Sequence, residues 1–229
     1  MIHVQDRGLV VPGDLLAEGN YRVGTGAYRE GGRVYSSVVG LASVSEREIK
    51  VVPLQGPYIP APGDNVIGIV VDIHYSGWIL DINSPYTGNL FISDFLHRKA
   101  DLAKEAPEEY LGVGDTVLAS VREVDERMRV LLETEGPRSG KIVGGKMIEI
   151  APVKIPRVLG KKGSMLDILK KVGRCRLIVG QNGRIVVYGD DQRAVDAVVR
   201  AIFMIEREAH TTGLTDRVRL MLERETMGM

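Results

Sequence analysis

The sequence has one cysteine, few aromatic residues and no net charge. Among 229 residues, Lys and Arg number 30, Asp and Glu also number 30, and Phe, Trp and Tyr make up 5%. The single Cys175 excludes an internal disulfide framework and a zinc site built from several cysteines. Such cysteine usage is typical of a reducing, cytoplasmic environment. No apolar run approaches the roughly 20 residues of a membrane helix, and the N-terminus lacks the apolar core of a signal peptide, so we expect no membrane partner.

Motifs of the common hydrolases and nucleotide-binding enzymes are also missing. The sequence contains no Ser-His-Asp arrangement, no His-x-Glu-x-x-His and no Walker loop, and its four histidines are scattered. The acidic pairs at 108–109 and 190–191 could in principle hold magnesium for a nuclease. Both pairs fall on expected surface turns or helix starts, where a cap or a solvated side chain is the simpler explanation. We therefore expect no catalytic residue, no metal site and no cofactor.

The charges are distributed unevenly along the chain. Residues 136–184 contain twelve Lys or Arg against two acids, which leaves the remainder with a compensating negative excess. Asymmetry of this kind indicates a localised anionic partner, although a solvated basic face would give the same count.

The first two thirds of the sequence favour β structure. Residues 1–58 carry short, glycine-punctuated strand patterns with no helical periodicity, and four prolines between positions 53 and 62 indicate a linker. Strands are predicted at 65–73, 78–82, 88–92, 116–124 and 128–133. Five strands in about seventy residues is the number in an OB-type barrel, here spanning 59–135.

Residues 136–229 have an α+β pattern. A strand at 147–155 is followed by a helix at 164–172 and a hairpin of 176–179 with 184–188. The hairpin centres on Asn182-Gly183, which favours a type I′ turn. Asp190 is the expected cap of a long amphipathic helix, and residues 215–224 form a final helix.

Between these elements lies the sequence Gly160-Lys161-Lys162-Gly163. Two glycines let a sugar-phosphate backbone approach closely, while the lysines and the following helix N-terminus favour phosphate. The order strand, helical turn, Gly-x-x-Gly, helix, hairpin, helix is that of a KH module, whose loop clamps about four nucleotides. Residues 155–163 closely resemble type I KH domains, with Arg157 as a further phosphate contact. Leu159 and Leu166 are expected in the core or lining the groove.

The barrel region carries a second resemblance. Residues 68–78, which end in His74-Tyr75-Ser76-Gly77-Trp78, resemble the first hairpin of the S1-type RNA-binding barrel, in which aromatic rings face the ligand. Filling of the barrel interior by Trp78 is the alternative. Residues 94–135 contain eleven acids against six bases, so backbone contacts would depend on a few cations.

The domain order points to one family. A β-rich N-terminal unit, an S1-type barrel and a KH domain, together with the Gly-x-Asn-Gly sequence at 180–183, resemble the ribosomal RNA-processing protein 4 family of archaeal exosome cap subunits. The resemblance covers essentially the whole chain and implies a non-catalytic role. Three cap subunits, of this chain with or without the other cap subunit, would sit on a hexameric ring of RNase-PH-like subunits. The N-terminal unit would dock on the ring, and single-stranded, A-rich RNA would pass to the phosphorolytic sites of the ring.

The fold expected is thus mixed and multidomain, with a small all-β unit, a five-stranded OB/S1-type barrel and an α+β type I KH domain. A stand-alone S1/KH transcription or translation factor and a metal-dependent nuclease are the competing hypotheses. The candidate RNA-binding residues are Arg157, Gly160, Lys161, Lys162, Gly163, Gly180, Asn182, Gly183, His74, Tyr75, Trp78, Arg98, Lys99, Arg122 and Arg127.

Overall fold

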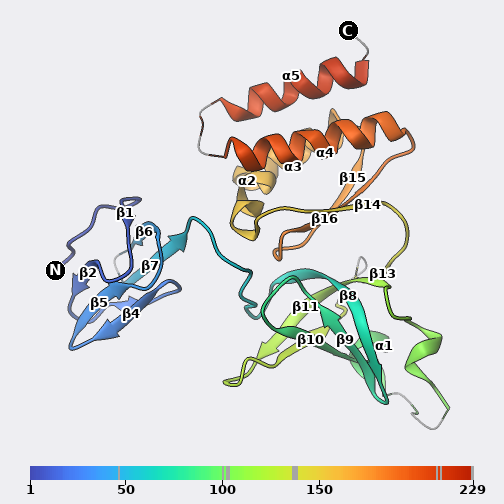
Figure 1. Ribbon diagram of the computed structural model, residues 1–229, viewed down its shortest axis with the longest axis horizontal. Helices are drawn as coiled ribbons and strands as arrows, with labels where there is room; N and C mark the ends of the chain where they lie inside the picture. The colour runs from blue at the N-terminus through green and yellow to red at the C-terminus, as the bar shows by residue number, and fades with distance from the viewer. Residues whose placement is uncertain are drawn as a thin grey trace. The chain divides into compact units, whose positions relative to one another are not determined.

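The computed structural model describes residues 1–45, 47–99, 101, 104–135, 139–209, 211 and 213–227 (Figure 1). The chain divides into two compact units, Met1–Gly56 and Pro57–Met229. The division falls inside the proline-rich stretch that the sequence predicts as a linker. The first unit holds the N-terminal β structure, and the second holds both the barrel and the α+β domain.

The N-terminal unit is built from short strands alone in its described residues, as predicted. One sheet has the order β1-β6-β7-β3 and the other β2-β5-β4. The strands are β1 Leu9–Val10, β2 Leu15–Glu18, β3 Arg22–Val23, β4 Ala27–Glu30, β5 Arg33–Ser36, β6 Gly40–Val44 and β7 Glu48–Pro53. Leu16, Val34 and Ile49 are completely buried between them. This small core gives the unit its own hydrophobic centre.

Five strands of the second unit close into a barrel. They are β8 Asn65–His74, β9 Gly77–Asp81, β10 Thr87–Phe91, β11 Thr116–Val124 and β12 Val130–Glu133. They pair in the circular order β8-β9-β10-β12-β11, with β10 and β12 parallel, and β13 (Gly140–Ile142) adds to the free side of β11. A short helix, α1 (Ile92–Leu96), follows β10. This is the strand order of an OB-type barrel, which confirms the predicted architecture.

Trp78 belongs to the interior of the barrel. Its side chain is fully buried, its Nε1 donates to the carbonyl of Leu111 at 3.0 Å, and its ring lies edge-on to that of Phe95 with centroids 5.2 Å apart. A buried indole needs a partner for its N–H, and the carbonyl of Leu111 supplies it. The prediction that Trp78 stacks on a base is therefore wrong, because no face of the ring reaches solvent.

The α+β domain has the order of elements of a type I KH fold. Its sheet has the order β14-β16-β15, all antiparallel, and its helices lie on the side of the sheet away from the barrel (Figure 1). The elements are β14 Lys146–Glu149, α2 Ile155–Leu159, α3 Ser164–Lys171, β15 Arg176–Val179, β16 Arg184–Tyr188, α4 Gln192–Arg207 and α5 Leu214–Met227. The predicted strand over 147–155 is shorter, because Pro152 begins a 3-10 turn that leads into α2.

Helix α4 is capped one residue later than predicted. Asp191, not Asp190, accepts the backbone N–H of Arg193 at 2.9 Å. The ion pair between Arg217 and Glu208 then helps to hold α5 antiparallel to α4.

The hairpin between β15 and β16 also differs from its prediction. The Gly183 N–H donates to the Gly180 carbonyl at 3.3 Å, the Gly180 N–H donates to the Arg184 carbonyl at 2.9 Å, and in this turn only Gly183 has a positive φ. A type I′ turn needs positive φ at two consecutive residues. The turn is therefore closer to a three-residue loop with a left-handed glycine than to the predicted type I′ turn.

The free face of the KH sheet packs on the barrel. Val186, Ile178 and Tyr188 meet Ile67, Leu118 and Ile142 in a shared apolar cluster. Isolated KH sheets with a solvated face would show polar residues at these strand positions. The near-continuous apolar sequence of β15 and β16 is therefore explained by two covered faces, with the helices on one side and the barrel on the other.

Polar contacts between the hairpin turn and the barrel surround this apolar cluster. We call residues 180–184 with their partners on β8 and β9 the joint. Gln181 exchanges two hydrogen bonds with the backbone of Asn65: its N–H donates to the Asn65 carbonyl at 2.7 Å, and its Oε1 accepts the Asn65 N–H at 2.5 Å. The turn thus extends the hydrogen bonding of β8 where that strand begins.

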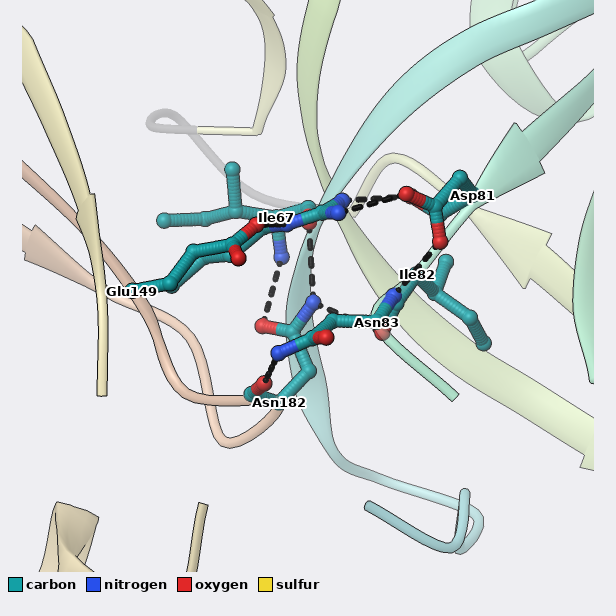
Figure 2. A network of polar contacts seen from close by, with 7 residues as sticks. Ile67, Asp81, Ile82, Asn83, Glu149 and Asn182 are labelled. Atoms are coloured by element: carbon teal, nitrogen blue, oxygen red, sulfur yellow. Dashed lines mark hydrogen bonds and ion pairs between the residues drawn. The ribbon is translucent and has the colours of Figure 1, made fainter. Parts of the chain in front are cut away.

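Asn182 is the centre of the joint (Figure 2). Its side chain is fully buried, and its amide nitrogen donates to the carbonyls of Ile67 and Ile82, each at 2.9 Å. Its Oδ1 accepts the N–H of Ile67 at 3.2 Å, and the side-chain amide of Asn83 donates to its carbonyl at 2.8 Å. One side chain therefore satisfies backbone groups on strand β8 and on the segment that follows β9.

Arg184 is the second buried polar residue of the joint, with 3% of its surface exposed. Its guanidinium donates to the carbonyl of Asp81 at 2.6 Å and to the Asp81 carboxylate at 2.5 Å, while its Nε donates to Glu149 at 2.7 Å. Burial raises the pKa of Asp81, but hydrogen bonds from Arg184 and the Asn83 backbone outweigh it, and the pKa lies below its usual value. A buried arginine held by two carboxylates fixes the relative orientation of barrel and KH sheet.

The joint corrects the predicted role of the Gly180–Gly183 turn. Gly180, Asn182 and Gly183 are all buried, so this turn is not an RNA-contacting surface. A Cβ at Gly183 would lie 2.3 Å from the carbonyl oxygen of Ile150, and one at Gly180 would lie 2.3 Å from Oδ1 of Asn182. Close packing explains both glycines without a ligand.

Replacement of Asn182 tests the joint. We expect Asn182→Ala to lower the free energy of unfolding of the second unit by about 3 kcal/mol, because the Ile67 N–H and the Ile82 carbonyl would lose their partner and the Ile67 carbonyl would keep only Arg184. Fluorescence of the only tryptophan, which reports on the barrel core, follows the transition in urea. Asn20→Ala, at an exposed site in the N-terminal unit, is the matched control. Equal midpoints for N182A and wild type would contradict the assignment.

Candidate nucleic-acid interface

The Gly160–Gly163 loop adopts a conformation that requires both of its glycines. Gly160 has φ 72° and ψ 171°, and a Cβ there would lie 2.6 Å from the backbone nitrogen of Met165. Gly163 has φ 82° in open space, and Lys162 between them also lies in the left-handed region, with φ 54°. Only glycine takes such angles without cost, so the two glycines turn the chain sharply between α2 and α3.

The loop presents positive charge to solvent. The side chains of Arg157, Lys161 and Lys162 are all exposed. Helix α3 begins immediately afterwards, and its N-cap position is Gly163, which has no side chain to bond the first helical N–H groups. Within the loop the Gly163 N–H donates to the Gly160 carbonyl at 3.2 Å and the Ser164 N–H donates to the Lys161 carbonyl. Exposed lysines at the positive end of a helix form a suitable site for a phosphate group.

A groove of about 1080 Å³ lies between the KH domain and the barrel. Its lining includes Leu159, the residue before Gly160, but none of the residues 160–163. On the KH side it is lined by Leu159, Leu166, Lys170, Arg176, Leu177, Ile178, Val179 and Tyr188, and on the other side by Asn65, Leu118, Glu135, Ser139 and Val143. The groove is thus formed by both domains. The expectation that Leu159 and Leu166 belong to the core or the groove is confirmed.

Lys170 and Arg176 are groove residues that the sequence did not single out. Both belong to the basic block of residues 136–184, but a count of charges does not show which of these residues face the groove. Alternation along β15 contains the missing signal: Leu177 packs into the helix-covered core, so its neighbours Arg176 and Ile178 must face the other way.

Tyr75 is the exposed aromatic residue of the barrel hairpin. It lies in the turn between β8 and β9 with 73% of its surface exposed. His74 is partly buried, its ring lies edge-on to that of Phe91 at 6.1 Å, and its Nδ1 accepts the backbone N–H of Ser76 at 3.3 Å. Of the three candidates in this hairpin, Tyr75 offers an open ring face, His74 supports the turn and Trp78 is internal.

The four candidate cations of the barrel fall into two groups. Arg98 is paired with Glu105 and Arg122 with Asp94, the latter at 2.7 Å. The hydrogen bond from Arg98 lowers the pKa of Glu105 to about 2. Lys99 and Arg127 have exposed side chains. These cations and Tyr75 do not line the groove. The structure therefore keeps Arg157 and the Gly160–Gly163 loop together at one exposed site, places the Gly180–Gly183 turn in the joint, and leaves the barrel candidates apart from both.

Two further observations concern the part of the chain that the structure describes. It contains no cluster of three or more His, Cys, Asp or Glu side chains that could hold a metal ion. None of its helices is both long enough and apolar enough to cross a membrane.

Comparison with known proteins identifies the relatives of the chain. Residues 7–55 match the family of the exosome RNA binding protein RRP4 N-terminal domain, and residues 145–193 match the KH domain family. A solved crystal structure described as an exosome complex RNA-binding protein superposes with a TM-score of 0.70 at 39% identity, covering 75% of this chain and 98% of that one.

Two curated relatives extend the similarity over nearly the whole sequence. Exosome complex component Rrp4 of Pyrococcus horikoshii is 45% identical over 223 residues, covering 96% of this chain and 84% of the relative. The same component of Methanothermus fervidus is 47% identical over 219 residues, covering 96% of each chain. The chain therefore belongs to the Rrp4 family of exosome complex components.

Proposed function

We propose that this chain is a non-catalytic, RNA-binding component of an exosome, and that single-stranded RNA binds to the Gly160–Gly163 loop and the groove beside it. The observation that carries the proposal is the loop itself. Two glycines with positive φ expose Lys161 and Lys162 at the start of α3, and the residue before the loop, Leu159, lines the interdomain groove. Phosphates bind at the loop, and bases lie along the aliphatic lining of the groove.

The relatives support the assignment to an exosome. Their names place them in that complex, and the similar crystal structure is described as an RNA-binding protein of it. In this chain the basic block of residues 136–184 contributes Lys170 and Arg176 to the groove, whereas the barrel is acidic. Nonspecific attraction for RNA is therefore concentrated on the KH domain.

The N-terminal unit docks on a hexameric ring of RNase-PH-like subunits, in a cap of three subunits. Five of its apolar side chains are about half exposed or more: Met1 at 79%, Leu9 at 66%, Val11 at 47%, Val39 at 48% and Val52 at 49%. So many exposed apolar residues on a small unit are typical of a surface that is covered in an assembly. RNA captured by the cap passes to the phosphorolytic sites of the ring, where Tyr75, Lys99 and Arg127 contact the strand on its way. A preference for A-rich RNA is part of this proposal.

Charge reversal in the loop tests the RNA site. Lys161→Glu combined with Lys162→Glu is expected to weaken binding of single-stranded RNA at least about ten-fold and to reduce the salt dependence by about 0.7 for each phosphate that the loop no longer neutralises. Fluorescence anisotropy over a salt series measures both. Lys50→Glu with Arg219→Glu, two exposed sites on β7 and α5, makes the same change in charge elsewhere. If both double variants bind alike, the loop is not where RNA binds.

A second experiment tests docking. In size-exclusion chromatography with a reconstituted RNase-PH-like ring, wild type is expected to co-elute with the ring. Leu9→Asp should abolish co-elution, because a carboxylate in a covered apolar surface stays unpaired. Val113→Asp, at a 67%-exposed valine of the barrel, serves as the control and should co-elute. If L9D still co-elutes, docking uses another surface. A wild-type chain that remains alone would favour a stand-alone RNA-binding factor.

The non-catalytic role has its own test. Pure protein incubated with end-labelled RNA, magnesium and phosphate should release no nucleotides, and addition of the ring should start processive shortening of the RNA. Turnover by the isolated chain at a rate unaffected by the ring would favour the nuclease hypothesis instead.

A further inference from the structure

A second hollow lies at the end of the KH sheet remote from the joint. Its volume is about 760 Å³. It is lined by the start of β14, the segment before β15, the end of β16 and the first turn of α4. The residues are Gly145, Lys146, Arg174, Arg176, Val187, Tyr188, Gly189, Asp190, Gln192 and Val195. We call it the distal hollow. It contains neither the Gly160–Gly163 loop nor any residue of the barrel.

The distal hollow and the interdomain groove adjoin each other. Arg176 and Tyr188 line both of them. The guanidinium carbon of Arg176 lies 5.6 Å from the centroid of the Tyr188 ring, in a cation–π contact. Tyr188 in turn packs against the apolar cluster of the joint. Arg176 is therefore held with a defined orientation at the place where the two hollows meet, rather than left as a mobile surface cation.

Arg174 extends the basic character into the distal hollow. Cys175 between the two arginines is buried, so Arg174 and Arg176 stand on its two sides with exposed side chains. Arg174 has φ 51°, a left-handed conformation that is uncommon outside glycine and that is often retained at functional positions. Its place in the turn before β15 brings its side chain to the lining of the distal hollow and not of the groove.

The charges of the distal hollow suit a single phosphodiester group. Lys146 is engaged by Asp196, at 2.9 Å, and Asp190 also belongs to the lining. Arg174 and Arg176 then exceed the remaining acid by one charge. One internucleotide phosphate carries one negative charge, so the excess matches one such group better than a multiply charged ligand.

We propose that RNA bound at the Gly160–Gly163 loop continues along the groove, passes Arg176 and places a further phosphate in the distal hollow against Arg174. The proposal rests on the RNA site proposed above and extends it beyond the roughly four nucleotides that a KH loop clamps. Arg176 and Arg174 thus set the length of strand that the domain holds.

Length dependence of affinity tests this path. Unstructured RNAs of about four and about eight nucleotides are compared on the full chain by fluorescence anisotropy. Wild type should bind the longer RNA more tightly. Arg174→Gln should bind the short RNA like wild type but the long RNA about five-fold more weakly, with a salt slope smaller by about 0.7. Arg193→Gln, an exposed arginine on α4 outside both hollows, removes the same charge and should match wild type on both RNAs.

Arg176 is tested with two variants, because its contact with Tyr188 could also support folding. Arg176→Lys keeps the charge and Arg176→Gln removes it, and thermal melting is recorded for both. We expect R176Q to melt at the same temperature as wild type or R176K. R176Q should bind the long RNA no more tightly than the short RNA, whereas R176K should retain part of the difference in affinity.

The possible outcomes separate this inference from the proposed function. If R174Q binds the long RNA like wild type, or loses affinity equally for both lengths, the path past Arg176 is wrong while the loop site stands. If the charge-reversed loop variant still binds the short RNA normally, the loop site itself is wrong. Weaker binding of the long RNA alone by R174Q supports the path.

Discussion

Asn182 lies where the KH hairpin meets the barrel, and backbone groups of both domains are hydrogen-bonded there. Its side-chain amide bonds the backbone of Ile67 and Ile82 in the barrel, while the hairpin that carries it belongs to the KH sheet. A buried side chain that satisfies backbone groups on two segments of the barrel cannot shift by a residue without leaving several of them unpaired. Arg184 adds a buried charge that must stay within hydrogen-bonding distance of Asp81 in the barrel and Glu149 in the KH sheet. The orientation of the KH domain on the barrel follows from these contacts, and with it the second wall of the groove.

This arrangement changes what the hairpin does for RNA. A KH domain alone would have an open groove beside β15, whereas here Asn65 and Leu118 of the barrel bound its far side. The hairpin tip therefore supports recognition by shaping the groove and not by touching the ligand. The same contacts leave the Gly160–Gly163 loop in solvent, since α2 and α3 lie on the other side of the KH sheet. The hairpin turn thus has a structural role, and the Gly160–Gly163 loop of similar composition is the one proposed to bind RNA.

Local pattern is enough to predict most elements. It locates the hairpin strands over 176–179 and 184–188 and four of the five barrel strands to within about a residue at most ends, because alternation and turn residues mark them directly. Burial of Trp78 is also readable, since Leu80 and Ile82 share its face of the strand. Asn182 could not be assigned from the sequence, because Asn-Gly favours a turn equally well at an exposed tip and at one docked on another domain. Arg184 becomes interpretable only once the register places it opposite Glu149.

The uneven distribution of charge between the two domains explains how a chain with no net charge can bind RNA. The acidic surface of the barrel pairs Arg98 and Arg122 internally, so two of its four candidate cations are already engaged by carboxylates. The KH domain has a surplus of cations, and two of these, Lys170 and Arg176, line the groove with the apolar residues that would contact bases. Attraction that is confined to one groove orients a strand, whereas the same charge spread over both domains would bind RNA in many registers. With RNA at the proposed site, the acidic barrel would contribute to selectivity by offering the strand few alternative places to bind.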